Sequence, residues 1–184
     1  MSTVIITPAD PIITLVDAKQ HLRVDDYERD AQITALIEAA TLWTQDRLQL
    51  ALGPQVLEWR GWSFNGVTLV GPVSEIVSVS YVDRDGADQV VNPADYVLTV
   101  ERLAAAIGYS WPSVACREDA VRVRYRAGFE SNDDSPPVEN VPQPIKSAIL
   151  LQLELLFDRP EASRAEALER SRDDLLALYW RRRG

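Results

Sequence analysis

The stretch DAVRVRYRAGF, residues 119–129, decides the fold class, because its side chains alternate between apolar and basic. An alternation of period two is typical of a strand with one buried face and one face toward solvent. The two faces consist of Val121, Val123 and Tyr125 on one side and Arg122, Arg124 and Arg126 on the other. The sequence therefore predicts a half-buried strand here, and an antiparallel sheet around it.

Upstream segments extend this prediction, because they are rich in β-branched and aromatic residues and are bounded by Gly, Pro or Asp. They are LEWRGW (57–62), GVTLVG (66–71), IVSVSYVD (76–83) and QVVNPADYVLTV (89–100). Between the last two, Asp85-Gly86 is a hairpin turn signal. The region of about 56–129 is thus expected to be a small antiparallel β region.

On both sides of this region the hydrophobic period changes to that of a helix. Helices are expected at about 14–24, 30–51 and 145–158, with a last helix and basic tail in 162–184. Thr14, followed three positions later by Asp17, is a variant of the capping box that begins the first helix. The polar stretch ESNDDSPPVEN (130–140) is expected to form an exposed loop.

The segment 145–158 is apolar nearly all round. Such a helix is either central to the core or covered on one side by a neighbouring subunit. The expected fold is α+β and mainly α, a helical core with an inserted small antiparallel β region and a C-terminal helix. Residues 1–161 would form the main domain, and 162–184 would follow it.

Charge argues against general nucleic-acid binding, because 28 acidic and 19 basic side chains give a formal net charge of -9. The C-terminal piece differs, since residues 145–184 carry seven acidic and eight basic side chains. No apolar run reaches the ~18 residues of a membrane span, and the N-terminus does not resemble a signal peptide. We therefore expect a soluble protein without a membrane partner.

Residue types argue against an enzyme, a cofactor or a metal centre. The chain has one histidine, His21, and one cysteine, Cys116, and it has neither a phosphate-binding glycine loop nor a nucleophile elbow. We expect Cys116 to be small and partly buried, and His21 to lie on a helix surface or to be packed. Paired carboxylates occur, but they fall in expected loops or on a charged helix face.

The end of the last helix places Tyr179 and Trp180 directly before three arginines. Tyr, Trp and Arg are the residues of interface anchors. The alternative is a frayed terminal helix whose basic end complements its own dipole.

In order and spacing, these segments resemble the head–tail connector (adaptor or head-completion) proteins of tailed bacteriophages and gene transfer agents. The resemblance spans most of residues 12–161. It is carried by LVDAKQHLRVDDYERDAQITALIEAAT (15–41), SEIVSVSYVDRDG (74–86), NPADYVL (92–98), IGYSWPS (107–113), DAVRVRYRAGF (119–129) and VPQPIKSAILLQLELLFDRPE (141–161).

The resemblance implies a structural virion protein, made in the bacterial host cytoplasm and placed at the head–tail interface. It implies a ring of twelve copies under the portal, which joins the capsid vertex to a stopper or tail protein. DNA would pass through this ring without specific binding. The resemblance implies that the portal is bound by Leu175, Leu178, Tyr179, Trp180, Arg181, Arg182 and Arg183. A second hypothesis, based on the helix that is apolar nearly all round, places the ring interface at Leu150, Leu151, Leu155 and Phe157.

Two other functions remain open on the residues alone. One is a generic soluble bacterial α+β protein-interaction module whose terminal helix docks on some other partner. The other is a hydrolase that uses scattered carboxylates, which would need a deep pocket with at least two carboxyl groups of displaced pKa.

Overall fold

The computed structural model describes residues 1–130 and 139–180. The chain forms two compact units, and each is built from two separate stretches. The strand unit comprises Met1–Ala9 and Ala51–Val138; the helical unit comprises Asp10–Leu50 and Glu139–Gly184. Part of the loop expected at 130–140, and Arg181 to Arg183, lie outside the described residues.

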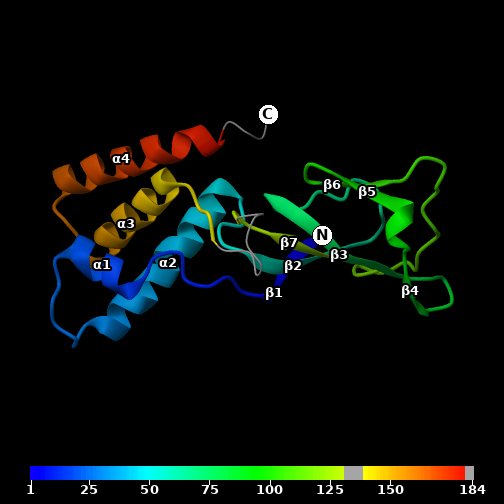
Figure 1. Cartoon of the computed structure of the whole chain (residues 1–184), viewed down its shortest axis with the longest axis horizontal. Coiled ribbons are helices and arrows are strands. Elements are labelled where there is room, and N and C mark those ends of the chain that lie inside the picture. The colour runs from blue at the N-terminus through cyan, green and yellow to red at the C-terminus, as the bar shows by residue number, and fades with distance from the viewer. Residues whose placement is uncertain (131–138, 181–184) are drawn as a thin grey trace. The chain divides into compact units, whose positions relative to one another are not determined.

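The strand unit contains a five-stranded antiparallel sheet of order β1-β2-β7-β3-β4 and a separate hairpin of β5 and β6 (Figure 1). The strands are β1 (Ser2–Thr7), β2 (Gln55–Gly61), β3 (Val73–Val82), β4 (Asp88–Val90), β5 (Tyr96–Thr99), β6 (Arg102–Ala105) and β7 (Val121–Ala127), with a 3-10 turn at Pro93–Asp95. The predicted alternation in β7 is confirmed, because Val121, Val123 and Tyr125 are fully buried.

The core of this unit lies on the apolar face of β2, β3 and β7, where Leu57, Trp59 and Val79 join the buried residues of β7. Phe64 packs over this face and stacks on Trp111, with ring centroids 4.3 Å apart. The Tyr125 hydroxyl accepts a hydrogen bond of 3.1 Å from the Val70 N–H, so the polar end of this buried ring is satisfied.

Local turn chemistry sets the β3–β4 hairpin, as the Asp85-Gly86 signal predicted. Gly86 has a φ of +86°, which L residues rarely adopt. The Asp83 carboxylate accepts hydrogen bonds from the N–H groups of Asp85 and Ala87. The pKa of Asp83 is held below its ordinary value, mainly by a hydrogen bond from the Gln89 side chain and by the Ala87 N–H.

The helical unit consists of α1 (Leu15–Leu22), α2 (Asp30–Leu48), α3 (Gln143–Asp158) and α4 (Ala162–Trp180). Thr14 caps α1 as predicted, since its hydroxyl oxygen accepts a hydrogen bond from the Asp17 N–H. Helix α3 contacts each of the other three helices, which explains why it is apolar nearly all round. Its fully buried residues are Ile145, Ala148, Ile149 and Leu153.

Three expectations need correction. The fold is α+β but not clearly mainly α, because 38% of the described residues are helix and 26% are strand. The apolar run 66–71 forms only one bridge, Thr68 to Arg102, while Val67 and Leu69 are buried in the core as part of a connection. Cys116 is exposed, not partly buried.

Candidate functional site

The polar face of the sheet gathers arginines around one buried carboxylate. Four of the seven arginines of the strand unit, Arg60, Arg122, Arg124 and Arg126, lie on this face although the unit has twelve acidic residues. We call these four arginines and the residues between them the arginine face. Register explains the arrangement, because β2 and β7 pair Glu58 with Arg124 and Arg60 with Arg122.

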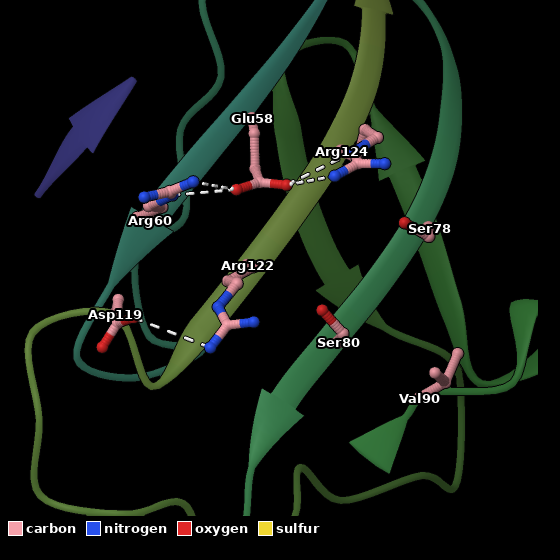
Figure 2. Close-up of a pocket in the computed structure, with 8 residues that line it drawn as sticks. All are labelled: Glu58, Arg60, Ser78, Ser80, Val90, Asp119, Arg122 and Arg124. Atoms are coloured by element: carbon pink, nitrogen blue, oxygen red, sulfur yellow. Dashed lines mark hydrogen bonds and ion pairs between the residues drawn. The ribbon is translucent and has the colours of Figure 1, made fainter. Parts of the chain in front are cut away.

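An open depression of about 430 Å³ lies on the arginine face. Figure 2 shows its lining, with the side chains of β2, β3 and β7 on neighbouring strands. The lining residues are Glu58, Arg60, Ser78, Ser80, Val90, Asp119, Arg122 and Arg124.

Glu58 lies at the centre and is held from both sides. Its carboxylate accepts hydrogen bonds from the Arg60 Nε at 2.8 Å and from the Arg124 Nη2 at 2.9 Å. The Glu58 side chain is 6% exposed, whereas the two arginines are 40% and 45% exposed. Burial alone would raise the pKa of Glu58, but the hydrogen bonds from Arg124 and Arg60 outweigh it and lower this pKa.

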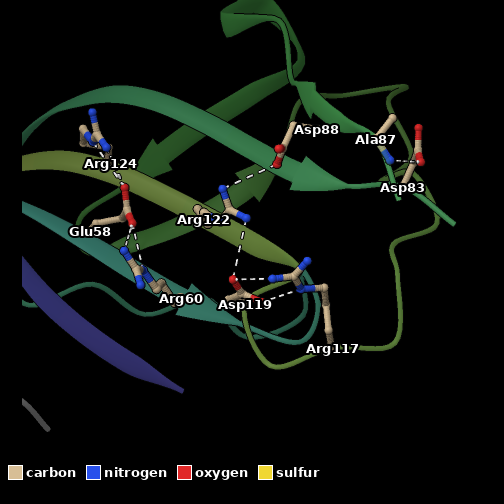
Figure 3. A network of polar contacts seen from close by, with 9 residues as sticks. All are labelled: Glu58, Arg60, Asp83, Ala87, Asp88, Arg117, Asp119, Arg122 and Arg124. Carbon is tan, nitrogen blue, oxygen red and sulfur yellow. Dashed lines mark hydrogen bonds and ion pairs between the residues drawn. The ribbon is translucent and has the colours of Figure 1, made fainter. Parts of the chain in front are cut away.

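At the other end of the depression, Arg122 lies between two carboxylates. Its guanidinium is 3.4 Å from Asp88 and 3.6 Å from Asp119. Figure 3 draws both contacts as dashed lines. Asp119 also forms a two-pronged ion pair with Arg117, at 2.5 and 2.8 Å, which lowers the pKa of Asp119. The Nε of Arg122 is buried and has no hydrogen-bond partner among the described residues.

Replacing Glu58 by Gln tests the lowered pKa of Glu58. A carboxylate whose folded pKa is depressed stabilises the fold above its unfolded pKa, ordinarily near 4.5, and this stability is lost as pH falls through the folded pKa. Because the partner arginines are well solvated, E58Q should cost about 1 kcal/mol at pH 7. We expect it also to flatten the fall in stability below pH 4.5, measured by urea unfolding from pH 7 to pH 3.

The matched control for this prediction is Glu75→Gln. The Glu75 side chain is 62% exposed and lies 3.6 Å from Arg126 on the same face. We expect E75Q to leave both the stability at pH 7 and its pH dependence nearly unchanged. Equal effects of the two variants would contradict the central position of Glu58.

In the helical unit, a buried arginine fastens the C-terminal helix to its neighbours. Arg172 of α4 is 8% exposed and donates from Nη1 to the Gln152 Oε1 of α3 at 2.5 Å. Its guanidinium also lies 4.1 Å from the ring centroid of Trp43 of α2. Leu176, one turn further along α4, is fully buried. Helix α4 is therefore an integral part of the helical unit up to Leu176.

The proposed portal-binding residues differ in exposure. Leu178 is 71% exposed and Trp180 is 37% exposed, while Leu175 and Tyr179 are half-buried. The Arg47 guanidinium lies 4.8 Å from the Trp180 ring. The structure thus brings Leu178 and Trp180 to the surface, and the arginines Arg181 to Arg183 lie outside the described residues.

The proposed ring-interface residues on α3, namely Leu150, Leu151, Leu155 and Phe157, are all half-buried. Phe157 lies under the Arg29 guanidinium, 5.5 Å from its ring centroid. Leu150 lines an open depression of about 480 Å³ together with Ile12, Ile13 and Lys146. That these four residues form a ring interface stays a prediction.

Potential metal ligands do not cluster among the described residues. There is no cluster of three or more His, Cys, Asp or Glu side chains that could hold a metal ion in residues 1–130 and 139–180. His21 contacts Glu154, with Nε2 3.2 Å from the carboxylate. Within the same residues, no helix is both long and apolar enough to cross a bilayer.

Sequence reasoning missed Glu58 and the open edge strand β1. The arginines of β7 were visible as an alternation, but their pairing with Glu58 depends on the β2–β7 register.

The chain belongs to the phage gp6-like head-tail connector protein family, whose model matches residues 12–107. This family consists of structural connectors, not enzymes. The resemblance inferred from the sequence is thereby confirmed. A comparison with curated proteins finds no significant match.

Solved structures support the same fold. A chain from the "virion of native gene transfer agent (GTA) particle" has a TM-score of 0.67 at 18% identity, over 92% of this chain and 94% of that one. A chain from the "neck of empty GTA particle computed with C6 symmetry" has a TM-score of 0.68 at 19% identity, over 93% and 95%. A third chain, from the "neck of native GTA particle computed with C12 symmetry", has a TM-score of 0.67 at 20% identity. The match covers 93% of this chain and 94% of that one.

Proposed function

We propose that this protein is a head–tail connector of a virion or gene transfer agent particle, located in the neck. Its copies form a ring under the portal, join the capsid vertex to a stopper or tail protein, and surround the DNA path without specific binding. The observation that carries this proposal is the family match over 12–107, and fold similarity to chains of GTA necks over nine-tenths of the chain supports it. A ring of twelve fits both the six-fold and the twelve-fold symmetry of these necks, because twelve-fold symmetry contains six-fold symmetry.

The experiment that tests this role mixes the purified protein with the portal protein from its own gene cluster. Sedimentation and negative-stain imaging should then show a ring of added density at the narrow end of the portal. A well-folded protein that makes no complex at micromolar concentration would contradict the role, and would leave an interaction module with another partner.

We further propose that the end of α4 contacts the portal through Leu178, Trp180 and the arginines that follow. The half-buried Leu175 and Tyr179 would support this contact from within α4. We also propose a functional division at residue 161, with residues 1–161 as the connector body and 162–184 as the portal-binding end, although α4 packs within the helical unit. A truncation after Asp174 would also remove the buried Leu176, so a surface substitution tests the contact more cleanly.

We expect Leu178→Glu to weaken portal binding at least tenfold, because a carboxylate would then be desolvated in an apolar contact. The measurement is the dissociation constant for the portal by sedimentation or interferometry. Leu42→Glu is the matched control, because it makes the same substitution at another exposed leucine of the helical unit. Leu42 lies on α2 and is 57% exposed. Equal binding by the L178E variant and the unchanged protein would contradict this contact.

A further inference from the structure

Strand β1 is apolar, and among residues 1–130 and 139–180 it pairs with β2 alone. It therefore forms one edge of the sheet that these residues build. All six of its residues are exposed, including Val4 at 38%, Ile5 at 51% and Ile6 at 40%. Its sequence, STVIIT, contains no charged residue and no proline.

An edge of this kind presents a row of unpaired N–H and C=O groups to any extended chain. Natural proteins usually blunt such edges with lysine, proline, a bulge or a covering segment. Strand β1 has no charge and no proline to prevent pairing, and its pairing with β2 is irregular at one place, the register shift between Ile5 and Thr7. It is therefore a site for β-strand addition.

Among the described residues, the same sheet has a second edge that is only partly paired. Residues 73–78 of β3 pair with β7 on one side, while β4 pairs only with Ser80, Tyr81 and Val82 on the other. Val77 in this free stretch is 48% exposed. The free stretch and β1 each contain six residues, so they match in length. Their existing ladders are irregular at Val73/Glu75 and Ile76/Ser78 of β3 and at Ile5/Thr7 of β1, so regular pairing is expected over only part of each strand.

We propose that β1 of one copy adds to the free edge of β3 in a neighbouring copy, so that the sheet continues from subunit to subunit. Strand directions favour this partner. In the order β1-β2-β7-β3 every neighbouring pair that the structure forms is antiparallel, so β1 runs opposite to β3. A copy whose strands keep this direction places its β1 antiparallel beside β3 and continues the alternation.

The pairing joins two different surfaces, as a closed ring requires of its subunit contacts. The inference therefore rests on the proposed ring. One added strand buries less than the ~1,000 Å² typical of a stable interface. The copies consequently stay separate in solution, and the pairing forms when the portal holds them side by side.

Cysteine cross-linking on the assembled ring tests the pairing. In a Cys116→Ser background, Val77→Cys is combined in turn with Val4→Cys, Ile5→Cys and Ile6→Cys, because cross-strand neighbours lie within disulfide reach. We expect mild oxidation of portal-bound rings to give a ladder of covalent oligomers with at least one pair, and none with Val77→Cys alone. Rings that give no ladder with any pair overturn the proposal, as do covalent dimers from Ile5→Cys alone, which would place β1 against β1.

A charge on the edge gives a second, independent test. Ile5→Lys should reduce the yield of portal-bound rings at least tenfold with an unchanged melting temperature. Val97→Lys is the control, since Val97 is a 46% exposed strand residue of β5, and its ring yield should be normal. If the unchanged protein forms no ring, the proposed function fails; if both it and the I5K variant form rings equally, only the strand addition fails.

Discussion

Replacing Gly128 by Ala is expected to lower the free energy of unfolding by about 3–5 kcal/mol. Gly128 follows β7 with a φ of +124°, where an L side chain is strained. A Cβ there would also overlap the Gly53 carbonyl and the Pro54 nitrogen. These backbone atoms cannot easily move, because the Phe129 N–H donates to the Leu52 oxygen at 2.7 Å.

Gly86→Ala is the matched control for this prediction. Gly86 also has a positive φ, +86°, but an added Cβ would meet nothing within 4 Å. Gly86→Ala should lower the free energy of unfolding by only about 1 kcal/mol, because it adds backbone strain but no overlap. Urea unfolding followed by tryptophan fluorescence measures both, since Trp59 is buried in the strand unit. Equal costs would show that the close approach to Gly53 does not matter.

Arg172→Ala is expected to destabilise the helical unit by about 2–3 kcal/mol. The substitution removes the donor to Gln152, which is 7% exposed and would be left buried without this partner. It also removes the guanidinium from the face of the Trp43 ring and leaves a space between α2, α3 and α4. Thermal unfolding followed by circular dichroism at 222 nm measures the loss.

The control for this second prediction is Arg170→Ala, two residues away on the same helix. Arg170 is exposed, so its removal should change stability by less than about 0.5 kcal/mol. A loss of the same size in both variants would contradict a special role for the contacts of Arg172, because Ala is at least as good a helix former as Arg.

Local patterns predicted much of the fold. The alternation in β7, the Asp85-Gly86 turn and the Thr14 cap each depend on residues close in sequence, and the structure has all three. The secondary structure of the apolar run 66–71 was harder to predict, because a short apolar run fits a strand and a buried connection equally well. The family was also recognised correctly from the order of segments.

Features that depend on distant partners escaped prediction. Strand β1 is held by β2, about fifty residues later, and its STVIIT sequence does not alternate. Glu58 becomes central only when the β2–β7 register brings Arg124 beside it. The apolar surface of α3 allowed either a core or a subunit interface, and only its contacts with three helices reveal how much of it the chain itself covers.

The division of both units along the chain has a consequence for protein synthesis. Helices α1 and α2 leave the ribosome first, but their packing partner α3 begins about 95 residues after α2 ends. At roughly 5–20 residues per second this delay is on the order of 10 s. Ile33 and Ile37 stay uncovered during that time, since an isolated helix of this length is marginal in water. All strands of the sheet are therefore synthesised before α3, so the sheet can form while α1 and α2 still lack this partner.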